Sequence, residues 1–274
     1  MAVWTAKNFY KFFLHIFKYL FNILIMRIAL KIGYEGSKFN GFAIQPDKIT
    51  VEGEIIKILK KTKIIESREN ARFQYGARTD KGVSAIGNVI SFNCRGNVLK
   101  VMENLDDIWV FGYANVNEKF NPRYCKKKIY RYYLYDEGYD IERMKRVCSL
   151  FEGEHDFSNF ARIDGRNPVR KIDRISLKKN GDIIKIDFEG KSFLWNQIRR
   201  IVSAIIKAGE RKIEFEEIEN ALNKKIKKSF GISPAENLVL VDIKYDFNFI
   251  PTLSKKILIK REIFKDMMPL NRNK

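Results

Sequence analysis

Hydrophobic and polar positions along the chain follow two different periods, which together predict a mixed α+β protein. A period of two, typical of half-buried strands, alternates with apolar residues spaced three and four apart, typical of helices. The first half contains strands at residues 27–34, 71–76, 88–92 and 108–115, with helices following Thr50 and near residues 98–106. Strand, helix, two strands, helix and strand is the order of a ferredoxin-like unit, whose sheet is antiparallel.

A similar order follows in the second half. Asn180-Gly181 separates two alternating runs, residues 172–178 and 182–188, and this dipeptide is a strong signal for a hairpin. The surrounding pattern predicts strands at residues 127–135 and 238–245, and helices at residues 140–150, 198–209 and 214–223. We therefore expect two α+β domains, residues 26–123 and 124–274, with antiparallel sheets.

Residues 1–25 form a separate, strongly apolar N-terminal extension. On a helix, Lys11, His15, Lys18 and Asn22 fall on one polar stripe, which argues against a membrane-spanning helix. The segment fits a helix at a membrane surface, a helix that binds a partner, or upstream sequence included by choosing too early a start codon. We favour the last, because a clear first strand begins directly after Met26.

Charge points to a polyanionic partner. The 274 residues include 52 Lys and Arg against 33 Asp and Glu, which leaves a formal net charge of +19. A positive field of this size attracts nucleic acid, although a Lys-rich proteome would produce the same composition. Charge therefore suggests a partner but no reaction.

Cysteine and histidine are too sparse for several common kinds of site. Cys94, Cys125 and Cys148 lie far apart in the sequence, so neither a disulfide framework nor a zinc site is indicated. His15 and His155 are the only histidines, and neither lies in a motif for nucleophilic catalysis. Any catalytic chemistry is expected to use Asp, Glu, Tyr, Arg or Lys.

Asp80 lies in the loop with the strongest chemical signal. The loop follows a predicted strand, carries glycines at both ends and places Arg78 and Lys81 beside the carboxylate. Nearby cations favour the ionised form that a nucleophile requires. The alternative is a turn residue that hydrogen-bonds its own backbone, which is the commoner role of Asp in a glycine-containing loop.

The sequence around Asp80 resembles the tRNA pseudouridine synthase A family. Residues 76–85, Gly-Ala-Arg-Thr-Asp-Lys-Gly-Val-Ser-Ala, match its pattern G-x-R-T-D-x-G-V-x-A. Further segments agree in the same order, at residues 34–42, 50–54, 120–132, 153–160, 193–202 and 234–238. The match spans about residues 26–245. Glu35, Phe42 and Ala43 depart from the family pattern, and we expect these changes to affect the details of RNA contact.

The resemblance implies a site and a substrate. Asp80 is expected to attack the target nucleoside, Arg78 to fill the space left by the flipped base, Tyr130 to stack on that base, and Arg199 to pair with Asp80. The adjacent Arg200 is the alternative for the last role. No metal or cofactor is expected, since the reaction is an isomerisation. The family acts on the anticodon stem-loop of tRNA, at positions 38–40, as a cytoplasmic homodimer without a membrane partner.

The implied fold consists of two ferredoxin-like halves that flank a basic central cleft, in agreement with the order of elements. A cluster beside Tyr130 is expected to face phosphate: Arg123, Lys126, Lys127, Lys128 and Arg131. Leu238 and Leu240 are expected to be core residues with at most a secondary role in the pocket. Two rival functions remain, a non-catalytic RNA-binding protein and a ribonuclease or base glycosidase, which would also use a carboxylate.

Overall fold

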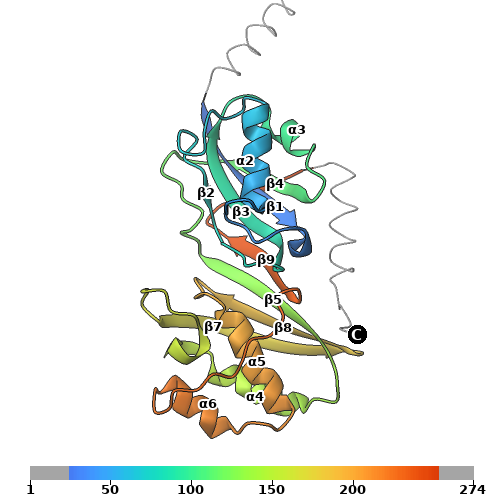
Figure 1. Ribbon diagram of the computed structural model, residues 1–274, viewed down its shortest axis with the longest axis vertical. Coiled ribbons are helices and arrows are strands. Elements are labelled where there is room, and N and C mark those ends of the chain that lie inside the picture. The colour runs from blue at the N-terminus through green and yellow to red at the C-terminus, as the bar shows by residue number, and fades with distance from the viewer. Residues whose placement is uncertain (1–24, 253–274) are drawn as a thin grey trace, which may run out of the picture.

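The first half of the protein forms the predicted ferredoxin-like unit (Figure 1). A computed structural model describes residues 25–252. The strands are β1 (Met26–Tyr34), β2 (Gln74–Tyr75), β3 (Ser84–Cys94) and β4 (Ile108–Asn115), and the helices are α2 (Val51–Lys61), α3 (Val98–Met102) and the 3₁₀ turn η1 (Gly36–Lys38). Their sheet order, β4-β1-β3 with β2 on β3, is antiparallel throughout. Thr50 caps α2 as expected, accepting a hydrogen bond from the Gly53 N–H at 3.2 Å.

The second half repeats the same topology. It contains β5 (Lys127–Tyr135), α4 (Ile141–Leu150), β6 (Gly153–Asp156), η2 (Ser158–Phe160), β7 (Val169–Asn180), β8 (Ile183–Gly190), α5 (Gln197–Gly209), α6 (Phe215–Leu222), β9 (Leu238–Lys244) and the short β10 (Ile250–Pro251). The order β9-β5-β8-β7-β6 is again antiparallel. The predicted α+β fold with two ferredoxin-like halves is therefore confirmed.

β9 joins the two halves into one sheet. It pairs with β5 on one side and, in parallel, with the start of β3 on the other, where Ser84 lies opposite Val239. Figure 1 shows β9 and β5 crossing the middle of the molecule. Gly87 permits this contact, because a Cβ there would lie 2.3 Å from the Val241 carbonyl oxygen.

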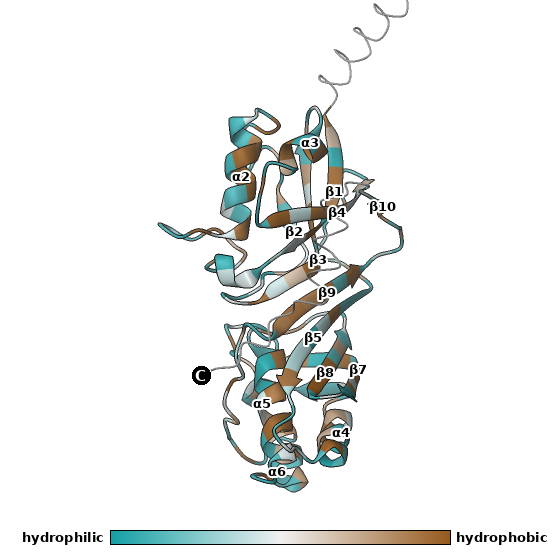
Figure 2. Ribbon diagram, turned by 90° about the vertical axis from the view of Figure 1, so that its right-hand side faces the viewer, coloured by the Kyte–Doolittle hydropathy of each residue, from teal (hydrophilic) through white to brown (hydrophobic). Residues whose placement is uncertain are grey.

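Each half has its own hydrophobic core between its helices and its part of the sheet. In the first, α2 contributes Ile55 and Leu59, both fully buried. In the second, α5 contributes Ile201 and Ile205 in the same way. Figure 2 shows the apolar colour concentrated on such strands as β9, while the helices carry polar stripes on their outer sides. The loop that carries Asp80 therefore joins two paired strands, β2 and β3, of the first half.

Several boundaries differ from the sequence-based prediction. α3 ends at Met102 rather than near residue 106, and the tight turn consists of Gly181 and Asp182, since Asn180 pairs with Ile183. β6 and β10 were not predicted, because runs this short carry no periodic signal.

The predicted extension, residues 1–25, lies outside the described residues except for Ile25. The division into domains at residues 26–123 and 124–274 stays a prediction. Within residues 25–252, no helix combines the length and apolar character needed to cross a bilayer.

Candidate active site

The loop that carries Asp80 connects β2 to β3 and bends back over the end of β1. Gly82 adopts a positive φ of 85°, a conformation that costs other residues steric strain. Gly36 lies directly against this loop, because a Cβ there would be 2.4 Å from the Val83 carbonyl carbon. The glycines noted in the sequence therefore allow two chain segments to pack without intervening side chains.

A buried polar network beneath the loop holds it in place. Asn88 on β3 accepts from the Ala77 N–H at 3.2 Å and donates to the Ala77 carbonyl at 2.9 Å. Its Nδ2 also donates to the Tyr34 hydroxyl at 3.1 Å, and that hydroxyl bonds to the Thr79 Oγ1 at 2.8 Å. Because Thr79 precedes Asp80, this network fixes the backbone on which the carboxylate stands.

Asp80 faces a pocket of about 450 Å³, within the range of small-molecule sites. The pocket lies where the two halves meet, since its walls come from the Asp80 loop, β5, the segment before β7 and the start of α5. Its charged lining residues are Arg78, Asp80, Arg123, Lys128, Asp164, Arg166, Arg170 and Arg199. Six cations against two carboxylates make this the basic central cleft expected from the sequence.

The charge state of Asp80 reflects two opposing effects. Burial raises the pKa of its carboxyl above the ordinary value, while the positive charges of Arg199 and Arg78 and a hydrogen bond from Trp195 lower it. Burial is the larger effect. The sequence had suggested that nearby cations would dominate, and the direction differs because distance along the sequence does not reveal desolvation.

Tyr130 lines the same pocket from β5, where it pairs with Phe188 on β8 and Leu240 on β9. Its ring meets Phe193 edge to face at a centroid distance of 5.4 Å. Burial and the negative charge of Asp80 both contribute to a raised pKa of its hydroxyl. The structure therefore brings Tyr130 and Asp80 together, as the sequence-based hypothesis required.

Arg199, on α5, also belongs to this pocket. Its Nε donates to the Ser233 carbonyl at 2.7 Å and its Nη1 to Asn196 Oδ1 at 3.3 Å, which hold the guanidinium where its charge acts on Asp80. The neighbouring Arg200 turns away, with its Nη1 3.5 Å from the Ser229 hydroxyl. The geometry favours Arg199 over Arg200 for interaction with Asp80.

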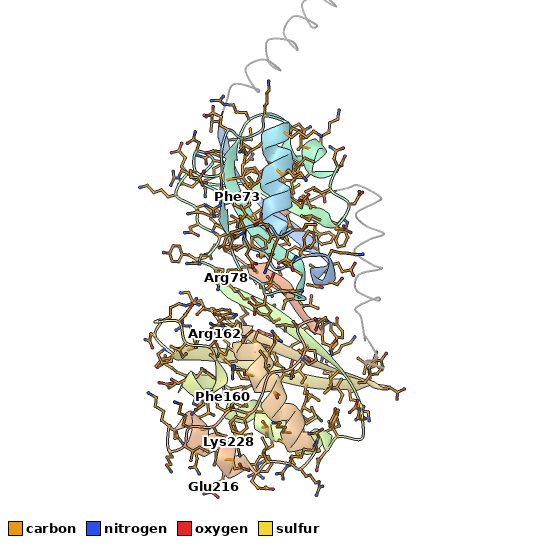
Figure 3. The ribbon with its side chains drawn as sticks, in the orientation of Figure 1. Phe73, Arg78, Phe160, Arg162, Glu216 and Lys228 are labelled. Carbon is orange, nitrogen blue, oxygen red and sulfur yellow. The ribbon has the colours of Figure 1, made fainter. Side chains whose placement is uncertain are left out.

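Arg78 extends to the pocket rim and is exposed. Its guanidinium lies 5.6 Å from the centre of the Trp195 ring, and that of Arg162 lies 4.1 Å from the same ring. Figure 3 places Arg78 in the first half and Arg162 in the second, on opposite sides of the junction. The contact between Arg78 and Trp195 therefore connects the Asp80 loop to the second half, in which Arg162 also packs on the Trp195 ring.

The basic cluster beside Tyr130 does not form a single phosphate-facing patch. Arg123 and Lys128 line the pocket, but Lys127 is paired with Glu189 at 2.6 Å and Arg131 with Asp187 at 2.6 Å. Successive residues of a strand point to opposite faces, so β5 divides the cluster. Lys128 itself is buried and donates to the Gly76 carbonyl at 2.6 Å.

Phe42 also differs from its expected role. It is fully buried, with ring centroids 5.9 Å from Tyr34 and 4.9 Å from Tyr75. This departure from the family pattern therefore lies in the core beneath the pocket, away from any surface that RNA would touch. Leu238 lines the pocket, while Leu240 is wholly core.

Sequence reasoning gave no role to Trp195 or Gln197, although both stand in the segment that resembled the family and both line the pocket. The sequence feature that could have indicated a role for them is their position just before Arg199, at the predicted start of a helix. Among the residues that the structure describes, no group of three His, Cys, Asp or Glu side chains gathers as metal ligands would.

Comparisons with known proteins point to one family. Residues 147–246 match a family described as tRNA pseudouridine synthase. The tRNA pseudouridine synthase A of Thermococcus sibiricus is 49% identical over 227 residues, which cover 81% of this chain and 85% of the relative. The Pyrococcus furiosus and Methanothermobacter thermautotrophicus proteins of that name are 44% and 39% identical, and each match covers at least 80% of both chains.

A solved structure of an H/ACA RNP bound to a substrate RNA containing 2′-deoxyuridine is 14% identical, with a TM-score of 0.33 over 66% of this chain and 43% of that chain. The curated relatives have a much higher sequence identity to this chain, and their similarity extends over both halves, including the Asp80 loop, β5 and the start of α5. The chain belongs to the tRNA pseudouridine synthase A family, a family of isomerases.

Proposed function

We propose that Asp80 is the catalytic carboxylate with which this enzyme converts uridine in tRNA to pseudouridine. The observation that carries the proposal is a contrast between two aspartates of the pocket. Asp164 is exposed, and Arg166 binds both of its oxygens, at 2.6 and 2.5 Å. Asp80 is half-buried and stands near Tyr130; it accepts one hydrogen bond, from Trp195, and Arg199 acts on it through space, so its carboxylate is not held by a two-point ion pair and stays available to a substrate.

The reaction exchanges one bond of the target nucleotide for another. Attack by Asp80, at the base or at the ribose carbon, allows the bond between ribose C1′ and uracil N1 to break. The uracil then rotates, C1′ bonds to its C5, and the bond to Asp80 breaks, which regenerates the free carboxylate. The C5 proton is released to solvent and N1 takes up a proton, so no atom is gained or lost and no redox cofactor takes part.

Uracil within a folded RNA must leave its stack before it reaches this pocket. Arg78, exposed at the rim and able to stack or donate hydrogen bonds, is suited to fill the vacated space. Tyr130 supplies an aromatic face for the flipped ring. Arg199 keeps a positive charge near Asp80 and so favours its ionised, nucleophilic form.

The anticodon stem-loop, at positions 38–40, is the proposed target, and a homodimer is the proposed active form. Both rest on the resemblance of the sequence motifs, and the basic pocket rim suits any RNA backbone. Mapping pseudouridine in tRNA transcripts after incubation with the enzyme tests the target positions. Light scattering of the purified protein tests the dimer, which a monomer mass would contradict.

The decisive experiment replaces Asp80 with Asn. Tritium release from tRNA containing 5-tritiated uridine should be lost, while tRNA binding is largely kept. Asp164→Asn, the matched pocket carboxylate, should retain turnover. Tritium release by Asp80→Asn at the wild-type rate would instead favour an RNA-binding protein in which Asp80 only shapes a loop. Free uracil or broken strands would indicate a glycosidase or ribonuclease.

A further inference from the structure

Gln197 is a buried polar residue of the pocket for which the steps above need no role. It is the first residue of α5, lines the pocket and has 0% of its surface exposed. Its Oε1 accepts a hydrogen bond from the Leu194 N–H at 2.7 Å. This bond fixes the orientation of the amide, because the flipped form would place an NH₂ group against another N–H donor.

The fixed orientation leaves the other end of the amide without a partner. Throughout residues 25–252, nothing accepts a hydrogen bond from Gln197 Nε2, although this atom is buried. An unsatisfied buried donor destabilises a fold, so such groups are rare and often await a ligand. Gln197 therefore contributes to this pocket residue set a donor amide that no group of the described residues satisfies.

The surroundings of Gln197 favour an uncharged acceptor. The same pocket is lined by the buried apolar residues Leu194, Ile198 and Leu238, and an anion placed among them would lose its hydration. Phosphate groups find better partners in the exposed Arg78 and Arg123. A carbonyl oxygen is the acceptor that this part of the pocket suits.

We propose that Gln197 Nε2 donates to a ring carbonyl oxygen of the flipped uracil and so acts as a specificity-determining residue. The proposal rests on the proposed function, since it assumes that the target base enters this pocket. Tyr130 would cover a face of the ring, which leaves the carbonyl groups at its edge, at C2 and C4, for the pocket wall. A donor at the C4 oxygen would also reject cytosine, which carries an amino group there.

The test combines a protein change with a change in the base. Gln197→Met keeps the side-chain length but removes the donor, and substrate tRNAs carry uridine, 2-thiouridine or 4-thiouridine at the target position. Sulfur is a weaker acceptor than oxygen. Single-turnover rates are followed by nucleoside chromatography. The single-turnover rate of Gln197→Met on uridine should be about tenfold to a hundredfold lower than that of the wild type, which is the effect of leaving a buried partner unpaired.

The rate of the wild type should fall by a similar factor on one of the two thio substrates, and that substrate identifies the ring oxygen that accepts the hydrogen bond. Gln197→Met should lose nothing further on that substrate, because the bond is already absent. Multiplicative losses on both thio substrates, or a wild-type rate for Gln197→Met, would overturn the proposal.

Two further variants separate structural damage from loss of the donor. Gln197→Glu retains an acceptor for the Leu194 N–H, so it should preserve the turn and still lose the rate on uridine. Gln45→Met, at an exposed site, should behave as wild type on all three substrates. A wild-type rate for Gln197→Glu would count against the proposal. The result of the Asp80→Asn experiment does not depend on the role of Gln197, so the proposed function can stand if this inference fails.

Discussion

Asn88 offers a sharp test of how the fold positions its candidate nucleophile. Asn88→Ala removes the amide that binds both the N–H and the carbonyl of Ala77, and Asn88 is 0% exposed. Each buried backbone group left unpaired costs about 1–3 kcal/mol, and water entering the new space would offset part of this. We expect the free energy of unfolding to fall by about 3 kcal/mol.

Urea unfolding followed by circular dichroism measures this change, and the midpoint should fall while the slope stays constant. Under native conditions, pseudouridine formation should fall more than tRNA binding, since Thr79 and Asp80 lose their fixed backbone. Asn70→Ala, at an exposed position, serves as the control and should change neither quantity. A loss of stability below about 1 kcal/mol, with full activity, would refute the positioning role of the network.

Three other outcomes follow from the site and the sheet. Because burial raises the pKa of Asp80, activity should fall in acid with a midpoint above that of an ordinary aspartate. Arg199→Gln should move this midpoint higher, and an unchanged pH–rate profile in the variant would contradict the interaction between Arg199 and Asp80. Because the pKa of Asp80 is raised in the folded state, stability is lost as pH rises from the unfolded pKa through the folded one. Asp80→Asn should therefore raise the melting temperature at neutral pH, but not at a pH below the unfolded pKa. Calorimetry at both pH values measures this, and an equal shift at both would argue against it. Gly87→Ala should destabilise the protein by about 2 kcal/mol, because its methyl group meets the β9 backbone, and an unchanged urea midpoint would show that β9 can move aside.

The sequence predicted most elements, because each depends on local periodicity and on capping residues such as Thr50. It could not predict that β9 lies between β3 and β5, since pairing between distant strands leaves no local signal. For the site, the segment around Asp80 was sufficient to nominate the carboxylate, whose role stays a prediction. The net direction of its pKa shift depends on how far the folded chain buries the carboxyl, which no short motif encodes.

The cluster from Lys126 to Arg131 shows a different limit. These residues are neighbours in the sequence, yet β5 sends Lys128 into the pocket and leaves Lys127 and Arg131 to pair with carboxylates of β8. Charge density along a chain therefore overstates the charge that a ligand meets when the segment is a strand.

The central place of β9 has a consequence for synthesis of the protein on the ribosome. The first half, with Asp80, emerges early, but β9, the strand that lies against β3, is made more than 140 residues after β3. Contacts between such distant segments form late and slowly. A nascent chain therefore carries its Asp80 loop without the opposing pocket wall, and the pocket is complete only after Leu238, at the start of β9, has been made.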